Sequence, residues 1–455
     1  MSGALAQILG AGLQTAGRID STGGETRTGA DLIALADRVA QTLARQGIAP
    51  DEPVLVRIGN RPADLGAILG VWRAGAVAVP LSVTAAPATF ERHKGVTGAR
   101  FLIDEDRLEA IGTKAPSPRP LLHDAALIMF TSGTTGLPKG AVVGHALFAA
   151  KLPVLDRLLG IRADDIVLVP LQLSFIYGLW VALLTLMKGA RLVLVPKFNA
   201  EIIAAALREV TVIGGVPSMY RALLLERAPQ APKLRTILTG GEVLPPALAR
   251  RLQAFSPAAI YDLYGLTETG TCDFCLQSAD QPHGFGSIGR ATEKIEFRIA
   301  PDGELQIKSP FGMLGYLDEP QLTADSFADG YFKTGDLARL NANGLVELIG
   351  RAKEIISRGG VKIAPLEIDH LLAEHPDIAA ALCAGVPDER LGEVVHAAIV
   401  PRAGAKLEPA ALREWLAART ERYKVPEAFY FCEALPAGST GKGDRKAVAR
   451  MSGRA

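Results

Sequence analysis

Hydroxyl groups, glycines and a lysine are concentrated in one stretch of the chain, residues 131–140. The sequence Thr-Ser-Gly-Thr-Thr-Gly-Leu-Pro-Lys-Gly follows an apolar run at 125–130 that is typical of a buried strand. A glycine-rich backbone can turn its N–H groups toward an anion, and the hydroxyls add further donors. Lys139 contributes a mobile positive charge. The stretch is therefore suited to holding a polyphosphate.

Two other interpretations of this stretch are available. A segment rich in glycine, threonine and serine is often only a surface loop. A Walker A loop would require Gly-x4-Gly-Lys-Ser/Thr, and counting from Gly133 places Pro138 where the second glycine belongs. Walker A is thus excluded, and the choice between a surface loop and a phosphate loop depends on the rest of the chain.

The whole string from Phe130 to Gly140 resembles the phosphate loop of the acyl-adenylate-forming superfamily. This superfamily includes AMP-forming acyl- and aryl-CoA ligases, adenylation domains of peptide synthetases, and luciferases. The resemblance implies that the loop binds ATP through Thr131, Ser132, Gly133, Thr134, Thr135, Gly136 and Lys139.

Tyr264-Gly-Leu-Thr-Glu268 resembles a second signature of the superfamily. A tyrosine ring can offer its flat face to a purine. By resemblance, Thr267 reaches the α-phosphate and Glu268 helps to hold Mg²⁺, a hard cation that prefers carboxylate oxygens. The resemblance also places Gly240, Gly241, Glu242, Asp262 and Gly265 among the ATP- and AMP-binding residues.

Asp336, in the segment 331–337, resembles the carboxylate that accepts hydrogen bonds from both ribose hydroxyls, and Arg351 resembles its cationic companion. Lys353 falls where the superfamily has its hinge residue. A hinge must absorb a backbone change, which a solvated polar residue tolerates.

The segment 439–446 resembles the C-terminal signature whose lysine enters the active site for adenylation. The resemblance assigns that role to Lys442. One ammonium group can neutralise charge as the substrate carboxylate approaches the α-phosphate. Gly359 and Gly360 are assigned to the coenzyme A region.

The acyl pocket is expected to include Ser174, Phe175, Tyr177 and Gly178. Many members of the superfamily carry a histidine in this segment; here it is absent, and Phe175 or Tyr177 could take its place. Domains that activate amino acids resemble one another in having Phe-Asp at the pocket, where this chain has Phe175-Ile176.

The segment 174–180 carries no charge, and 214–217 adds no cation. Because burying an unpaired second carboxylate costs several kcal/mol, a dicarboxylic acid such as malonate is disfavoured. We expect a monocarboxylate with an apolar body, aromatic or short to medium aliphatic. Phe175, Tyr177 and Trp180 favour an aromatic acid, although Trp180 could instead pack in the core, and Arg221 or Lys197 could fold into the pocket.

Composition narrows the class of protein. The chain has 455 residues, 49% of them apolar, which suits one large and one small domain. The net charge of +1 and the absence of a basic run argue against nucleic-acid binding. Cys272 and Cys275 form one CxxC pair, for which buried or idle thiols are a better interpretation than zinc. The first residues make a poor signal peptide, and the most apolar run, 179–187, is about half a membrane span. We expect a soluble, cytoplasmic protein without a membrane span.

Hydrophobic periodicity predicts helices at 28–47 and 64–74 and strands at 53–58 and 76–80, a rhythm typical of a parallel sheet covered by helices. Little could be predicted for 83–120. Three predicted strands end near residues 131, 240 and 265, and each is followed by glycines. We expect the three junctions to lie on one ligand-binding edge of the sheet. The latter two junctions are expected to lead into a helix.

From residue 286 onward, short strands and turns predominate, and beyond 350 helices and strands are mixed. We expect an α/β fold: a large N-terminal ATP- and acyl-binding domain at 1–350 with a β-rich end, a hinge at 351–353, and a small mobile α+β C-terminal domain at 354–455.

The predicted activity joins ATP, Mg²⁺, a small-molecule carboxylic acid and coenzyme A. The acid and ATP give an acyl-adenylate and pyrophosphate, and the thiol of coenzyme A then takes the acyl group. A carrier-protein thiol in place of coenzyme A, an amino-acid-activating domain, and a nucleotide-binding regulator without catalysis are the alternatives. Against the last, no residue assigned a catalytic role is missing.

Overall fold

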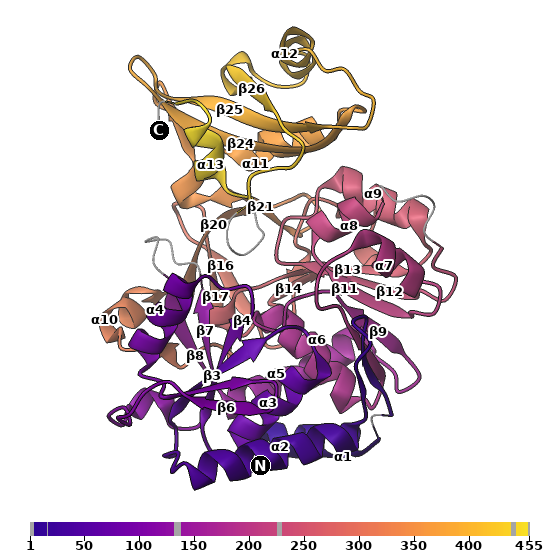
Figure 1. The fold of residues 1–455 in the computed structure, drawn as a ribbon. Coiled ribbons are helices and arrows are strands. Elements are labelled where there is room, and N and C mark those ends of the chain that lie inside the picture. The colour runs from indigo at the N-terminus through magenta and orange to yellow at the C-terminus, as the bar shows by residue number, and fades with distance from the viewer. Residues whose placement is uncertain (1–3, 16, 132–137, 225–229, 438–442, 454–455) are drawn as a thin grey trace.

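A computed structural model describes residues 4–15, 17–131, 138–224, 230–437 and 443–453. Within these residues, two large sheets form the N-terminal part, and a smaller α+β part with its own sheet lies beyond them (Figure 1). The first large sheet has the order β18-β8-β7-β4-β3-β5-β6, and the second has the order β15-β14-β13-β12-β11-β9-β10-β1-β2.

The strands of the first sheet are β3 (Pro53–Ile58), β4 (Val77–Ser82), β5 (Phe101–Asp104), β6 (Arg107–Ala110), β7 (Ala125–Thr131), β8 (Lys139–Gly144) and β18 (Gly315–Tyr316). The strands of the second are β1 (Ile19–Ser21), β2 (Thr26–Arg27), β9 (Ile166–Val169), β10 (Arg191–Leu194), β11 (Val212–Gly215), β12 (Thr236–Gly240), β13 (Ala259–Tyr264), β14 (Phe274–Leu276) and β15 (Arg290–Ala291). The helices of this part are α1 (Ala4–Thr15), α2 (Gly29–Arg45), α3 (Pro62–Arg73), α4 (Pro87–Thr97), α5 (His145–Leu159), α6 (Ile176–Met187), α7 (Ala200–Ala206), α8 (Pro217–Leu223) and α9 (Pro246–Phe255).

A shared apolar core joins the two sheets. It combines residues of β3 and β4 with residues of β9 and β10, and helices α1, α2, α3, α5 and α6 pack into it. Helices α7, α8 and α9 pack on a second core against the other face of the second sheet. Because α6 is buried along almost its whole length, it is held rigidly between the sheets.

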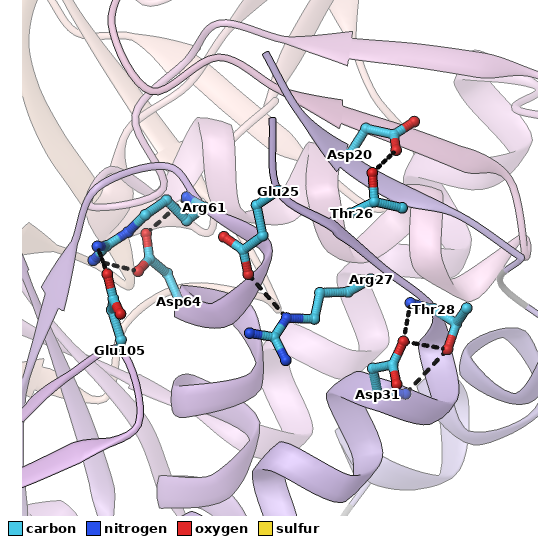
Figure 2. A network of polar contacts seen from close by, with 9 residues as sticks. All are labelled: Asp20, Glu25, Thr26, Arg27, Thr28, Asp31, Arg61, Asp64 and Glu105. Atoms are coloured by element: carbon cyan, nitrogen blue, oxygen red, sulfur yellow. Dashed lines mark hydrogen bonds and ion pairs between the residues drawn. The ribbon is translucent and has the colours of Figure 1, made fainter. Parts of the chain in front are cut away.

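Local chemistry explains where α2 begins. The Thr28 hydroxyl accepts a hydrogen bond from the Asp31 N–H (3.2 Å), and the Asp31 carboxylate accepts one from the Thr28 N–H (2.7 Å), which satisfies two helix N-terminal donors (Figure 2). The apolar residues of α2 that recur at helical spacing are buried. The helix predicted at 28–47 is confirmed at Gly29–Arg45.

The same N-terminal region holds a buried carboxylate, Asp64 at the start of α3 (Figure 2). It accepts hydrogen bonds from the backbone N–H groups of Gly59 (2.7 Å) and Arg61 (2.9 Å), and it pairs with the Arg61 guanidinium. Burial raises the pKa of Asp64 to about 6, against the opposing effect of these partners.

The β-rich end has the strand order β16-β17-β20-β19, with β21 beside β20. Its elements are β16 (Glu296–Ile299), β17 (Glu304–Lys308), α10 (Pro320–Asp325), β19 (Phe327–Ala328), β20 (Tyr331–Leu340) and β21 (Val346–Arg351). The C-terminal part contains β22 (Ile356–Arg358), β23 (Val361–Ile363), α11 (Pro365–Ala373), β24 (Ile378–Asp388), β25 (Gly392–Pro401), α12 (Pro409–Ala417), β26 (Ala428–Phe431) and α13 (Arg445–Arg450). A 3-10 turn at Ala352–Glu354 separates the two parts, and the boundary at 351–353 stays a prediction.

The expected mixed α/β architecture is confirmed, but the expectation of three junctions on one sheet edge is wrong. β7 belongs to the first sheet, whereas β12 and β13 belong to the second. β13 also leads into a 3-10 turn at Thr267–Thr269 and the antiparallel strand β14, not into a helix. The strand–turn–strand arrangement of β13 and β14 looks locally like a strand–helix junction, because glycines and hydroxyl residues suit either.

The segment 83–120, for which little could be predicted, contains α4, β5 and β6. Among the described residues, no helix has both the length and the apolar content needed to cross a membrane.

Candidate active site

The end of β7 and the turn after β13 meet although they belong to different sheets. The Thr131 hydroxyl donates a hydrogen bond to Glu268 Oε1 over 2.9 Å. Thr131 is the last residue of β7, and Glu268 lies in the 3-10 turn that follows β13. Thr131 of the first signature and Glu268 of the second therefore meet between the two sheets.

Glu268 has a second neutral neighbour. The Tyr316 hydroxyl donates to the same oxygen over 3.0 Å, and Lys139 Nζ lies 5.4 Å from the centre of the Tyr316 ring. In the part of the chain that the structure describes, no cation forms a salt bridge with Glu268. Its carboxylate is thus oriented by hydroxyl groups.

This arrangement fits a Mg²⁺ ion that arrives with a nucleotide. Mg²⁺ is usually bound by one or two carboxylates together with substrate phosphates and waters. Across the described ranges, no group of three or more histidine, cysteine, aspartate or glutamate side chains could hold a metal by itself. Glu268 therefore suits a shared metal site better than a site built by protein alone.

Asp336, Arg351 and Tyr264 form a second cluster. Asp336 and Arg351 are cross-strand partners in β20 and β21, and Arg351 Nε lies 2.7 Å from Asp336 Oδ1. The Tyr264 hydroxyl donates to Asp336 Oδ2 over 2.6 Å. Burial, and secondarily Asp336, raises the pKa of Tyr264 well above its usual value, so the hydroxyl stays a donor. The structure thus brings together residues that the sequence placed far apart.

The segment after β12 forms the wall between two cavities. Gly241 has φ +79, a left-handed conformation that favours glycine. Glu242 accepts hydrogen bonds from the hydroxyl of Ser218 (2.8 Å) and from its N–H (3.2 Å). A Cβ at Gly240 would lie 2.5 Å from the Leu263 carbonyl oxygen, so that glycine is required by the adjacent strand.

A cavity of about 640 Å³ joins the phosphate-side residues to an apolar interior. Among the predicted residues, it is lined by Thr131, Lys139, Phe175, Tyr177, Gly178, Gly240, Gly241, Glu242, Gly265, Thr267, Glu268, Arg351 and Lys353. Its apolar interior includes Met129, Leu171, Ile176, Trp180 and Met219. Ser174 lies in the loop before α6 and is not part of this lining.

An adjoining cavity of about 590 Å³ lies between the N-terminal and C-terminal parts. Asp262, Tyr264 and Asp336 line it, together with C-terminal residues such as Asp369. Burial raises the pKa of Asp262 to about 8, so its carboxyl is neutral at pH 7. Arg221, which could have entered the acyl pocket, lines this second cavity and is not part of the lining of the first.

Gly359 and Gly360 form the turn between β22 and β23, and neither belongs to the lining of the two cavities. Ser132, Gly133, Thr134, Thr135, Gly136 and Lys442 lie outside the described residues. Their roles stay predictions.

The loop that leads into α6 is held by Asn60, a residue that the sequence did not single out. The fully buried Asn60 amide donates to the Leu171 carbonyl (2.7 Å) and the Val195 carbonyl (3.2 Å), and it accepts from the Leu173 N–H (2.8 Å). Asn60 follows β3 of the first sheet, whereas its partners follow β9 and β10 of the second. It therefore ties the two sheets together beside the acyl pocket.

Tyr316 and Ser218 were also missed. Nothing in the neighbouring sequence of Asn60, Tyr316 or Ser218 indicates their partners, which lie between 24 and 135 residues away along the chain. Cys272 and Cys275 are buried free thiols, and burial raises the pKa of Cys272 to about 12, which agrees with the interpretation as idle thiols.

Comparisons with known proteins agree with this geometry. The AMP-binding enzyme family matches residues 14–117 and 104–317, and the AMP-binding enzyme C-terminal domain matches 367–442. A feruloyl-CoA synthase of Amycolatopsis sp is 31% identical, covering 92% of this chain and 93% of the relative. An oxalate–CoA ligase of Arabidopsis thaliana is 27% identical, covering 93% of each. The crystal structure of ATP-bound MatB from Rhodopseudomonas palustris has a TM-score of 0.88 at 24% identity over 99% of both chains, which shows a common fold.

Proposed function

The chain belongs to the AMP-binding enzyme family, and we propose that it joins an apolar, preferably aromatic, monocarboxylic acid to coenzyme A through an acyl-adenylate. The enzymes of this family use ATP, Mg²⁺ and coenzyme A. The observation that carries the choice of acid is the cavity of about 640 Å³, in which Thr131, Thr267 and Glu268 share one space with an apolar interior.

We assign the steps of the first half-reaction to the described residues of the cavity and, because its motif resembles that of the family, to Lys442. Asp336, held by Tyr264 and Arg351, accepts hydrogen bonds from the ribose hydroxyls and fixes the nucleotide. Thr267 donates to the α-phosphate and Lys442 neutralises charge there. The carboxylate oxygen of the acid attacks the α-phosphorus, the bond to the bridging oxygen breaks, and pyrophosphate leaves. Glu268 would help to hold Mg²⁺, which would supply charge stabilisation when bound.

In the second half-reaction the thiol of coenzyme A loses its proton to solvent, and the thiolate attacks the acyl carbon. The bond to the phosphate oxygen breaks, and AMP leaves with the thioester formed. Positioning and charge neutralisation supply most of the rate enhancement. We assign the hinge between the two half-reactions to Lys353, which lines the cavity just before the C-terminal part.

The cavity favours one class of acid among those that the family accepts. The feruloyl-CoA synthase is named for an aromatic acid and the oxalate–CoA ligase for a small dicarboxylate. The names of the relatives therefore do not decide between these two classes of acid. Among the described residues, the charged side chains that line the cavity belong to the nucleotide-binding segments and the β-rich end or hinge. α6 and the loop before it present Leu171, Phe175 and Tyr177 without a cation. A second carboxylate buried beside α6 would lack a partner.

The test is a panel of benzoate, cinnamate, hexanoate, oxalate and malonate, scored for pyrophosphate release with and without coenzyme A. We expect the highest kcat/KM for the aromatic monocarboxylates, and AMP release that requires coenzyme A. A preference for oxalate or malonate would overturn the acid class. Pyrophosphate release without turnover of coenzyme A would instead favour a carrier-protein thiol as the acceptor.

A further inference from the structure

A lysine of the N-terminal part is completely buried. Lys151 lies on α5 and is 0% exposed, and no other lysine or arginine among the described residues is buried. Its Nζ donates a hydrogen bond to the Cys272 carbonyl over 3.0 Å and lies 5.0 Å from the centre of the Phe311 ring. Because burying an ammonium group costs free energy, its presence in the core calls for an explanation.

The carbonyl that Lys151 holds belongs to a strained stretch of backbone. Thr271 has φ +66 and Cys272 has φ +47, so two residues with side chains follow Gly270 in the left-handed region. For a β-branched residue such as threonine this conformation is an outlier, and it persists only where the surrounding structure maintains it. The Thr292 hydroxyl donates a second hydrogen bond to the same carbonyl over 2.9 Å. Two side chains from other segments therefore hold this stretch in place.

The strained stretch directly follows two residues of the candidate active site. Thr267 and Glu268 lie in the 3-10 turn that ends just before the left-handed residues. The Thr271 N–H donates to the Leu266 carbonyl over 2.8 Å, which closes the backbone around them. A displacement of residues 271–272 would therefore also move both site residues.

Asp273 adds a buried charge of opposite sign at the same turn. It is 0% exposed and accepts a hydrogen bond from the Thr269 hydroxyl. Burial raises the pKa of Asp273 to about 6, and the charge of Lys151 acts in the opposite direction. Lys151 and Asp273 are thus two opposite charges buried beside one short segment of the chain.

We propose that Lys151 is a positioning residue for acyl-adenylate formation. It lines neither cavity, so it acts through the backbone. By holding the Cys272 carbonyl, it fixes the turn that presents Thr267 and Glu268. An apolar side chain could fill the same volume but could not donate to the carbonyl. The inference rests on the proposed function, since it concerns the same reaction.

The double variant Lys151→Met/Asp273→Asn separates positioning from stability. It removes both buried charges together, whereas Lys151→Met alone would leave a buried carboxyl without its cation. We expect urea unfolding close to that of the parent, because replacing a buried pair of charges by neutral groups is often neutral. With the best-used acid of the panel, kcat for pyrophosphate release should nevertheless fall about 100-fold.

Three further measurements identify the source of that loss. The half-saturating Mg²⁺ concentration should rise about tenfold, as expected when a group that supports a metal-binding residue is removed. The KM for the acid should not change, because the acyl end of the cavity is formed by α6 and the loop before it. The affinity for adenosine, measured by calorimetry, should also stay the same, since Asp336 and Arg351 lie on β20 and β21.

Two single variants complete the comparison. Lys188→Met is the matched control, because Lys188 is a half-buried lysine after α6 that pairs with Asp156 over 2.9 Å and lines neither cavity. It should leave kcat and the Mg²⁺ requirement unchanged. Asp273→Asn keeps Lys151 and should retain most of the activity. Parental kcat in the double variant, or an equal loss in Asp273→Asn, would overturn the proposal. Absence of pyrophosphate release by the parent with every acid would count against the proposed function instead.

Hydrogen exchange gives a readout that does not depend on activity. In the double variant the backbone amides of residues 266–273 should exchange about tenfold faster than in the parent, while those of β12 and β13 keep their protection. Unchanged exchange at 266–273 would contradict a role in holding the turn. Faster exchange throughout the N-terminal part would show that Lys151 supports the whole fold, and it would overturn the proposal as well.

Discussion

Asn60 and Trp180 are both completely buried close to the loop before α6, yet their polar groups differ in hydrogen bonding. The Asn60 amide has three hydrogen-bond partners within the protein. The Trp180 N–H has none among the described residues. The difference is between a polar side chain that ties the two sheets together and one that makes no hydrogen bond within the described residues.

The same contrast applies to two carboxylates. Asp64 in the N-terminal network has two backbone donors and the Arg61 guanidinium (Figure 2). Glu268 in the cavity has two neutral hydroxyls and no salt bridge within the described ranges. The donors around Asp64 are parts of the fold itself, whereas a carboxylate without a salt bridge can bind a metal ion that arrives with phosphates. Substitutions at the two kinds of position should therefore change different measurements.

Glu268→Gln should give the largest effect on activity with almost none on stability. The amide oxygen can still accept from Thr131 and Tyr316, but the charge that we assign to Mg²⁺ is lost. We expect pyrophosphate release to fall about 100- to 1000-fold, with the free energy of unfolding changed by less than about 0.5 kcal/mol. Glu296→Gln on the exposed strand β16 is the control. Full activity in Glu268→Gln would remove the carboxylate from the metal site.

Asn60→Ala should produce the reverse pattern. It leaves the Leu173 N–H and the Leu171 carbonyl without their partner, so we expect the free energy of unfolding to fall by about 2–3 kcal/mol. The KM for the acid should rise, because the acyl loop loses its anchor. Urea unfolding is compared with that of Asn199→Ala, which removes the cap of α7 and should cost about 1 kcal/mol. If the free energy of unfolding fell equally in the two variants, Asn60 would stabilise the protein no more than an ordinary helix cap.

Asp336→Ala tests a residue that belongs to both groups, since it is paired inside the protein and is expected to bind the ribose. The loss of a charged acceptor for the two hydroxyls should weaken ATP binding by about 2 kcal/mol, or roughly 30-fold. Calorimetric titration with ATP measures the effect, with the exposed Asp329→Ala as the control. Unchanged affinity would leave Asp336 with only a structural role.

Asp262→Asn should show its effect as a change in the pH dependence of stability, with no direct loss of activity expected. The carboxyl ionises near pH 4 in the unfolded chain but near pH 8 in the folded protein, so its contribution to stability declines as pH rises from 4 to 8. The stability of Asp262→Asn relative to the parent should therefore increase by about 1 kcal/mol per pH unit between pH 5 and 7. Thermal unfolding at several pH values measures this slope. A flat difference would mean that a cation or hydrogen-bond donor near Asp262 keeps its pKa close to the ordinary value.

The sequence determined the elements and motifs whose signals are local. The cap at Thr28, the apolar spacing of α2 and the strand at 53–58 appear where they were predicted, because capping and periodicity depend on residues a few positions apart. The AMP-binding family and its activity also followed from short ordered motifs. Asp336 and Arg351 were named as companions, and the register of β20 and β21 places them side by side.

Only the tertiary structure decided which groups meet and which remain unpaired. The phosphate strand and the Tyr264–Glu268 turn were expected on one sheet edge, yet they come from two sheets that face each other. Asn60, Tyr316 and Trp180 carry no local signal of their partners, since each partner or its absence depends on how distant segments pack. A hydrogen bond between residues more than a hundred positions apart forms only when the two sheets pack together. The residues next to either partner in the sequence therefore do not predict it.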